Sequence, residues 1–190
     1  MKLMIASDIH GSALWAEKLL AAFEREHADR LLLLGDLLYH GPRNDLPEGY
    51  APKAVIPLLN GMKERIWCVR GNCEAEVDQM VLSFPVMADY CALLMDGHVL
   101  YATHGHVYGE DNPPPLMPGD VLLCGHTHGG QIRLFGKSIL DLSRQEQRYL
   151  SGWNTETGQP ILTTTGVGCE TVNIRLGSTP EVWLITLRRA

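Results

Sequence analysis

The sequence predicts an α/β protein built from two packed β-sheets with helices outside them. Two observations support this fold class. In the first part of the chain, short apolar runs alternate with segments of helical periodicity in the order β-α-β-α-β. From about residue 91 onward, the pattern consists almost entirely of β elements. Alternating elements favour a parallel sheet covered by helices, and a second sheet packed on the first would accommodate the strands that follow.

The elements of the first half can be placed individually. Residues 2–7 form an apolar run typical of a buried strand, and a helix is expected over residues 13–26 with Ser12 as its N-cap. Leu31 to Leu34 are four consecutive leucines. Leucine favours helices, but this run is short and ends at a Gly-Asp pair, so we interpret it as a buried parallel strand. The other expected elements are a loop over 37–52, a helix over 53–62 kinked or shortened by Pro57, a strand over 65–69 and a short helix over 74–82.

The second half contains strands joined by turns and loops. Asp96-Gly97 is a strong hairpin signal and should join strands at 91–95 and 98–103. A Pro-rich loop is expected over 112–118 and a polar surface loop over 141–160. Further strands are expected at 120–123, 131–135, 161–165, 171–176 and 181–187. No linker divides the chain, so residues 1–190 are expected to form a single domain.

Composition excludes several classes of protein. The net charge is -6 and the sequence has no Lys/Arg-rich block, so a nucleic-acid groove is not indicated. The five cysteines are odd in number and form no C-x-x-C pair, which argues against a disulfide framework and favours a cytoplasmic protein. No apolar run approaches the roughly 20 residues that span a bilayer. An acidic protein that binds an anionic substrate would need a metal or arginines to offset its own field.

Side chains that can bind metals follow five of the predicted strands. Asp8 and His10 lie two residues apart on an extended segment, so their side chains point the same way. The other candidates at strand ends are Asp36, Asn72, His104, His126 and His128. Sites in open α/β sheets form at the carboxyl ends of strands, so we expect these five ends to be adjacent in one sheet, where they could converge. The mixture of nitrogen and oxygen ligands suits Mn²⁺, Fe²⁺ or Zn²⁺.

This ordered pattern resembles the calcineurin-like metallophosphoesterase superfamily. The matching blocks are Asp8-x-His10, Gly35-Asp36, Gly71-Asn72, His104 and Gly125-His126-x-His128. Residues 1–128 are most similar to the small bacterial phosphodiesterases of the YfcE type, with added likeness at residues 7–12, 41–50 and 69–73. The C-terminal third, including residues 125–131, 165–168 and 180–182, resembles another bacterial branch of the superfamily that is often membrane-associated.

The resemblance implies a double β-sandwich flanked by helices in four α/β/β/α layers, with a centre of two divalent metal ions. One ion would be held by Asp8, His10, Asp36 and His128, and the other by Asp36, Asn72, His104 and His126. Asp36 would bridge the ions, which relieves the repulsion between two cations about 3.5–4 Å apart. Mn²⁺ is the first expectation, with Fe²⁺ or Zn²⁺ as alternatives.

The implied function is a metal-dependent phosphodiesterase that uses a metal-activated water, with Asp36, Asn72, His104 and Cys73 as catalytic residues. Many superfamily members have a His general acid where this chain has Cys73, so good leaving groups should be favoured. Taken by itself, Cys73 could be reactive, but a small buried residue is the favoured interpretation. The alternative functions are a phosphomonoesterase or nucleotide hydrolase of the same fold, or a non-catalytic interaction scaffold like the retromer subunit of this superfamily.

The candidate substrate-binding residues are Arg43, Asn44 and His106. Arg43 could bind phosphate through its guanidinium or form a surface salt bridge. His106 could contact phosphate or be structural, and Arg70 is expected to be structural. The expected partner is a small phosphoester substrate, with no nucleic acid and no membrane span. Small family members are often oligomeric, so a homo-oligomer remains open.

Overall fold

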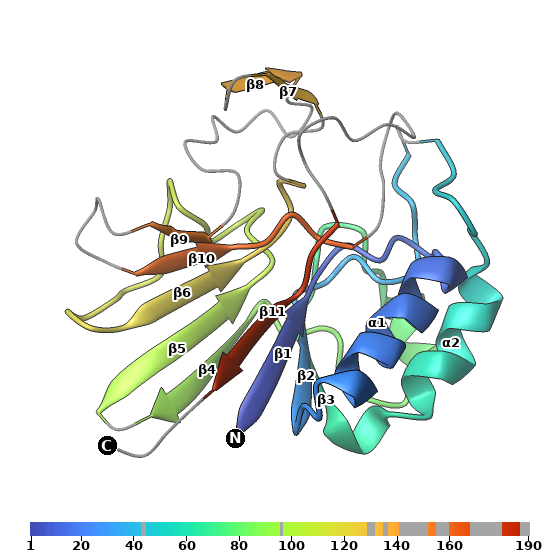
Figure 1. The fold of residues 1–190 in the computed structure, drawn as a ribbon, viewed down its shortest axis with the longest axis horizontal. Coiled ribbons are helices and arrows are strands. Elements are labelled where there is room, and N and C mark those ends of the chain that lie inside the picture. The colour runs from blue at the N-terminus through green and yellow to red at the C-terminus, as the bar shows by residue number, and fades with distance from the viewer. Residues whose placement is uncertain are drawn as a thin grey trace.

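The computed structural model describes residues 1–42, 45–95, 97–128, 132–134, 137–140, 152–154, 160–167 and 180–186. Its strands form two larger sheets and one separate pair (Figure 1). The first sheet has the order β11-β1-β2-β3, where β1 is Lys2–Ala6, β2 is Arg30–Leu33, β3 is Ile66–Cys68 and β11 is Trp183–Thr186. The second has the order β4-β5-β6-β10-β9, where β4 is Tyr90–Met95, β5 is His98–Thr103, β6 is Val121–Cys124, β10 is Ile161–Thr163 and β9 is Gly152–Asn154. β7 (Ile132–Leu134) and β8 (Lys137–Leu140) pair with each other.

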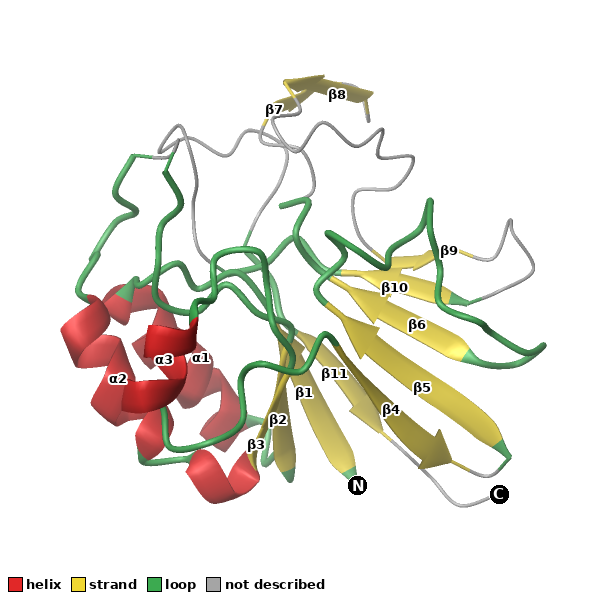
Figure 2. Ribbon diagram, turned by 180° about the vertical axis from the view of Figure 1, so that it is seen from behind, coloured by secondary structure: helices red, strands yellow, loops and turns green. Residues whose placement is uncertain are grey.

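Both larger sheets are mixed, and the predicted α/β fold class is confirmed. In the first sheet, β1, β2 and β3 are parallel and β11 is antiparallel to β1. In the second, β5, β6 and β10 are parallel, while β4 and β9 are antiparallel edge strands. The helices are α1 (Ala13–Arg25), α2 (Pro52–Asn60) and α3 (Glu76–Val81), with a 3₁₀ turn η1 at Lys63–Arg65. All of these helices lie on the side of the first sheet that faces away from the second (Figure 2).

The four-leucine strand is explained by burial on both of its faces. Leu31 and Leu33 pack among the residues between the first sheet and the helices, whereas Leu32 and Leu34 pack between the two sheets. All four side chains are fully buried. Removing such a side chain from water stabilises the fold by roughly 1.5–3 kcal/mol, so this short segment anchors both layers. Burial of both faces of the strand in apolar cores outweighs the helix propensity of leucine.

Most predicted elements agree with the structure to within a few residues. Ser12 caps α1 by accepting a hydrogen bond from the Trp15 amide at 3.3 Å. Helix α2 contains Pro57 and ends at Asn60, which is shorter than predicted. The predicted loop over 141–160 is wrong in part, because β9 lies within it and pairs with β10. Sequence missed β9 because its three residues are too few to show the alternation of a strand within a polar stretch. The predicted strand over 171–176 lies outside the described residues.

Candidate metal centre

The seven predicted ligand side chains lie together at one end of the molecule. Asp8 and His10 follow β1, and Asp36 and Asn72 follow β2 and β3 in the first sheet. His104, and His126 with His128, follow β5 and β6 in the second sheet. The expectation that the five strand ends are adjacent in one sheet is therefore wrong. They meet because the parallel strands of the two facing sheets have their carboxyl ends at the same end of the sandwich (Figure 2).

One group of ligand atoms centres on Asp8. His128 Nε2 lies 2.9 Å from Asp8 Oδ1, and His10 Nε2 lies 3.6 Å from the same oxygen. The two imidazole nitrogens, His10 Nε2 and His128 Nε2, are 3.4 Å apart. The three side chains are buried and could hold one metal ion.

A second group centres on Asp36 and His104. His104 Nε2 lies 3.3 Å from Asp36 Oδ2, 3.0 Å from Asn72 Oδ1 and 3.1 Å from His126 Nδ1. Asp36, His104 and His126 form another set whose ligand atoms lie within 4.8 Å of one another. Asp36 Oδ2 also lies 3.6 Å from His10 Nε2, so Asp36 reaches both groups.

The donor set fits divalent metal ions. Asp8 Oδ1 is buried and has no well-aligned hydrogen-bond partner within the described ranges, although imidazole nitrogens lie close to it. The Nδ1 atoms of His10 and His104 lie 2.8 Å and 2.7 Å from the carbonyl oxygens of Tyr39 and Leu34. A carbonyl only accepts, so each Nδ1 carries the hydrogen and a neutral ring presents the lone pair of Nε2 to the centre. Backbone carbonyls orient metal-binding histidines in this way.

Electrostatics at the site favours a bound cation. Burial alone would raise the pKa of Asp8, but its attraction to His128 and His10 holds that pKa well below the ordinary value. Burial also opposes ionisation of Asp36, yet the neighbouring His104 and His10 lower its pKa to about 2. Both carboxylates are thus charged at neutral pH inside a buried site. A metal cation would balance these charges.

The two central histidines of the second group have opposite shifts. Burial would lower the pKa of His104, but the charge of Asp36 raises it to about 9. Burial together with the positive charge of His104 lowers the pKa of His126 to about 4. His126 is therefore neutral at pH 7 and able to act as a ligand. His104 would release a proton when a metal binds, because its ligand form is the neutral ring.

The backbone at the centre is held in an uncommon conformation. Among the described non-glycine residues, positive φ angles occur at His27 and at five predicted ligands, namely Asp8 (61°), His10 (48°), Asp36 (57°), His126 (71°) and His128 (49°). Such angles cost free energy for residues with a Cβ and concentrate at functional sites. Gly71 lets the loop after β3 approach Asp36 closely, because a Cβ at this position would overlap Asp36 Oδ1.

Glu74 is the residue of this region that the sequence did not single out. Its buried carboxylate accepts hydrogen bonds from the amides of Asp36 (2.8 Å), Leu37 (2.7 Å) and Gly71 (2.5 Å). Burial and the charge of Asp36 raise its pKa. Glu74 thereby joins the loop after β2 to the loop after β3. The only sequence signal was an acidic residue directly after the Gly-Asn-Cys block, which does not reveal three amide partners.

Cys73 lies at the centre, and its amide donates to Asp36 Oδ1 at 2.8 Å. Its thiol belongs to a possible ligand group with His10 and Asp36. Burial raises the pKa of the thiol to about 11, so it is protonated at neutral pH. Its catalytic role remains a prediction.

Of the predicted substrate-binding residues, the structure describes His106 only. The centroid of its ring lies 5.2 Å from that of His104 and 6.0 Å from that of His126, so it borders the second group. Arg43 and Asn44 lie outside the described residues.

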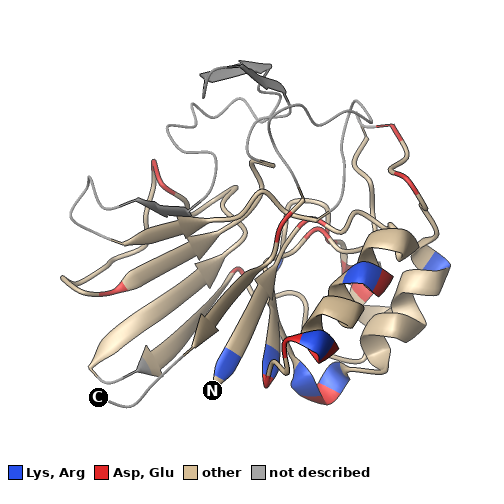
Figure 3. Ribbon diagram, viewed as in Figure 1, with Lys and Arg blue, Asp and Glu red and all other residues tan. Residues whose placement is uncertain are grey.

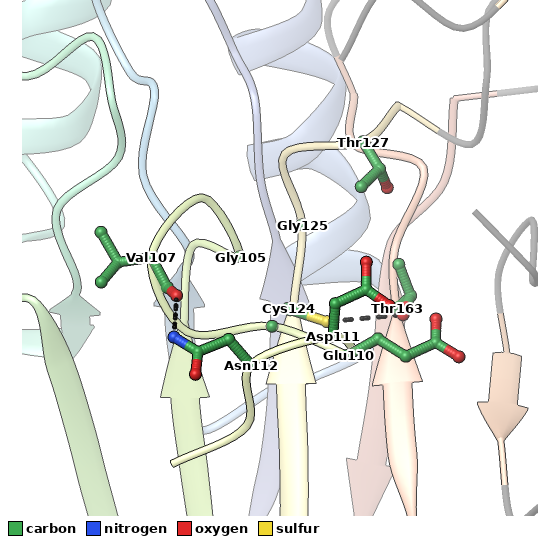
Figure 4. Close-up of a pocket in the computed structure, with 10 residues that line it drawn as sticks. Gly105, Val107, Glu110, Asp111, Asn112, Cys124, Gly125, Thr127 and Thr163 are labelled. Carbon is green, nitrogen blue, oxygen red and sulfur yellow. Dashed lines mark hydrogen bonds between the residues drawn. The ribbon is translucent and has the colours of Figure 1, made fainter. Parts of the chain in front are cut away.

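A cavity of about 60 Å³ lies beside the loops that carry His104 and His126 (Figure 4). Gly105, Gly125 and Thr163 line it together with the side chains of Glu110 and Asp111. Cys124, which faces this cavity, packs with residues on the outer face of the second sheet. The backbone after β5 and β6 borders the cavity. The carboxylates of Glu110 and Asp111 in its lining would repel a phosphate.

Charged side chains are distributed unevenly over the described chain (Figure 3). Lys and Arg gather on the helices and at the amino ends of β1 and β2. None of the helices in the described residues is both long enough and apolar enough to span a bilayer.

Fold and site together define a family. Residues 1–140 match the calcineurin-like phosphoesterase superfamily domain, and the chain belongs to this family. The family implies divalent metal ions, in agreement with the ligand groups described above. The resemblance stated from the sequence is confirmed.

Among the individual relatives is phosphodiesterase YfcE of Escherichia coli K12. It is 52% identical over 128 residues, which cover 67% of this chain and 70% of YfcE. Phosphodiesterase YaeI of the same organism is 42% identical over 72 residues, covering 37% of this chain and 26% of YaeI. The solved structure of the E. coli phosphoesterase YfcE superposes with a TM-score of 0.74 at 40% identity, covering 89% of this chain and 81% of that one. An archaeal phosphodiesterase at 16% identity, with a TM-score of 0.50 and coverage of 86% and 82%, shares the fold.

Proposed function

We propose that this chain is a metal-dependent phosphodiesterase that hydrolyses phosphodiester bonds at a dinuclear metal centre. The observation that carries the proposal is the position of Asp36, whose Oδ2 lies 3.3 Å from His104 Nε2 and 3.6 Å from His10 Nε2. Asp36 thus stands between the two ligand groups, where a bridging carboxylate is required. The similarity to the phosphodiesterase YfcE supports the reaction class.

The chain's own residues prepare the site for this chemistry. Bound divalent ions would supply Lewis-acid stabilisation of the phosphoryl oxygens and a water that is acidic enough to act as a nucleophile. Asp8 and Asp36 remain ionised at neutral pH because nearby histidines lower their pKa values. Asn72 adds an oxygen ligand without adding charge. The carbonyls of Tyr39 and Leu34 fix the rings of His10 and His104.

The state of Cys73 bears on the choice of substrate. A thiol with a pKa of about 11 is a much weaker proton donor than an imidazolium. Cys73 would therefore donate a proton poorly to a leaving group that needs one. We expect aryl phosphodiesters, whose leaving groups need no proton, to be hydrolysed faster than alkyl phosphodiesters.

We further propose Mn²⁺ as the metal, with Fe²⁺ or Zn²⁺ as alternatives, and one domain over residues 1–190. Pairing between the two ends of the chain supports a single domain, since Lys2 in β1 is opposite Thr186 in β11. We also propose a cytoplasmic location, because the cysteines form no disulfide framework in the sequence and Cys68, Cys73, Cys91 and Cys124 are free thiols.

The test is hydrolysis of bis(p-nitrophenyl) phosphate after removal of metal with a chelator and addition of single divalent ions. We expect Mn²⁺ to restore turnover, and Asp36→Asn to lose both bound metal and activity. Asp45→Asn, which changes an exposed carboxylate, is the matched control. Full activity of Asp36→Asn would refute the mechanism. Faster turnover of p-nitrophenyl phosphate would favour a monoesterase, and protein that binds no metal and turns over no ester would favour the scaffold function.

A further inference from the structure

Arg70 occupies an unusual place for a cation in this acidic chain. It follows β3 by two residues and directly precedes the Gly71-Asn72 pair of the centre. Among the residues whose side chains are described, it is the one Lys or Arg within two residues of the carboxyl end of a strand. Its backbone amide donates to the Ala88 carbonyl at 2.8 Å, which fixes the start of the side chain.

The guanidinium of Arg70 has unused hydrogen-bonding capacity. Its Nε atom is buried and has no hydrogen-bond partner among the residues that the structure describes. Within the described chain, the side chain also forms no ion pair, in contrast to Arg25 and Arg65, which pair with Glu26 and Glu24. A buried donor without a partner is costly, and such groups are rare in folded proteins unless a ligand or water satisfies them.

His106 shows the same feature beside the same centre. Its Nδ1 atom is buried and also lacks a hydrogen-bond partner in the described part of the chain. Its ring lies next to those of His104 and His126. Arg70 precedes Asn72 by two residues, and Asn72 Oδ1 lies 3.0 Å from His104 Nε2, so both unpartnered side chains belong to loops that carry the second ligand group.

We infer that Arg70 and His106 form an anion subsite at the edge of the metal centre, where the guanidinium of Arg70 contacts a phosphoryl oxygen of the substrate. A guanidinium is a rigid fork of donors that matches phosphate oxygens and stays charged at every working pH. A substrate phosphate would satisfy the buried Nε donor. This assignment rests on the proposed function and replaces the structural role expected of Arg70 from the sequence.

The chemistry of the subsite is selective for charge. A phosphodiester carries one negative charge, and the carboxylates Asp8 and Asp36 repel it. The metal ions would offset much of this field, and Arg70 would supply a fixed positive charge from the chain itself. Arg70 therefore acts as a positioning and affinity residue for the anion and has no role as a proton donor.

The experiment measures binding of inorganic phosphate to the Mn²⁺-loaded protein by calorimetry, together with kcat and KM for bis(p-nitrophenyl) phosphate. Arg70→Gln should weaken phosphate binding and raise KM by about 10- to 100-fold, the range expected for loss of hydrogen bonds between charged groups. Metal content and Tm should match the wild type. Arg70→Lys keeps the charge but loses the fork, so it should fall between the two. Arg25→Gln removes one exposed positive charge elsewhere and should change neither constant.

Two results would overturn the inference. One is unchanged phosphate binding and KM in Arg70→Gln. The other is a loss of activity with unchanged KM, together with lower Tm and lower metal content, because that combination shows a structural role. If the wild type binds phosphate but hydrolyses no diester, the proposed function fails. The subsite is then judged on phosphate alone, and weaker phosphate binding by Arg70→Gln supports it while equal binding refutes it.

Discussion

Glu74 should be important for the stability of the site even though it contacts no predicted ligand atom. Its Oε2 accepts from the amides of Asp36 and Gly71, and its Oε1 accepts from the amide of Leu37. Glu74→Ala removes all three acceptors from a buried place. Glu74→Gln keeps one carbonyl oxygen, which can serve two of the amides, but it places an NH₂ group against the third.

The size of the effect follows from the number of amides left without a partner. A buried donor that loses its acceptor costs about 1–3 kcal/mol. Glu74→Gln should therefore destabilise the protein by about 2 kcal/mol, since one amide is left unpaired and the other two bonds lose a charged acceptor. Burial and the charge of Asp36 raise the pKa of Glu74, so the buried charge of Glu74 is itself unfavourable. Its removal in Glu74→Gln offsets part of the lost stability. Glu74→Ala should cost about 4 kcal/mol, because three amides lose their acceptor.

The assay is urea unfolding of the metal-free proteins followed by circular dichroism, with thermal melts as a second measurement. For a chain of this size, each 1 kcal/mol lowers Tm by roughly 2–4 °C, so Glu74→Gln should melt about 4–8 °C lower. Glu17→Gln changes an exposed carboxylate on α1 and is the matched control. The variants should also bind Mn²⁺ less tightly, because the loop of Asp36 is no longer tied to Gly71.

A free energy of unfolding for Glu74→Ala within about 0.5 kcal/mol of the wild type, the usual range of neutral surface changes, would refute this reasoning. It would mean that water or backbone movement satisfies the three amides. A stability loss equal in the Gln and Ala variants would instead show that the charge, and not the count of acceptors, is decisive.

Three further predictions test other parts of the site and fold. Gly71→Ala should lower the free energy of unfolding by about 1–3 kcal/mol and weaken metal binding, because the new Cβ would overlap Asp36 Oδ1. In the control Gly61→Ala the nearest atoms to the new Cβ lie at 3.4 Å, so it should unfold like the wild type. Equal unfolding curves for the two variants would contradict the overlap at Gly71. His10→Ala should reduce metal content by about one ion per chain by mass spectrometry of metals, because His10 belongs to the Asp8 group; loss of both ions would show that the two sites assemble as a unit. Hydrogen bonds from the amides of Met117 and Val99 lower the pKa of Asp120 in the folded protein. The stability that Asp120 contributes is therefore fully present above its unfolded pKa of about 3.9. It is lost as the pH falls through the lower pKa of the folded state. The Tm difference between wild type and Asp120→Asn should accordingly be constant above pH 5 and shrink in acid, and a difference that grows in acid would contradict the sign.

Local patterns determined much of this protein. The run Leu31 to Leu34 is a strand because both of its faces are apolar, and the Asp96-Gly97 signal lies between the paired strands β4 and β5. The positions of Asp, Asn and His residues directly after apolar runs gave the candidate metal ligands. Each of these features depends on a few neighbouring residues, so a single sequence contains the information.

Only the tertiary structure decided how the strand ends meet. The candidate ligands come from two facing sheets, and β11 joins the first sheet antiparallel to β1 although it is distant in sequence. The left-handed backbone at Asp36, the three amides on Glu74 and the unpartnered Nε of Arg70 also appear only in three dimensions. These features depend on contacts between segments tens of residues apart, and hydrophobic periodicity, which is local, does not specify the partner of a distant segment.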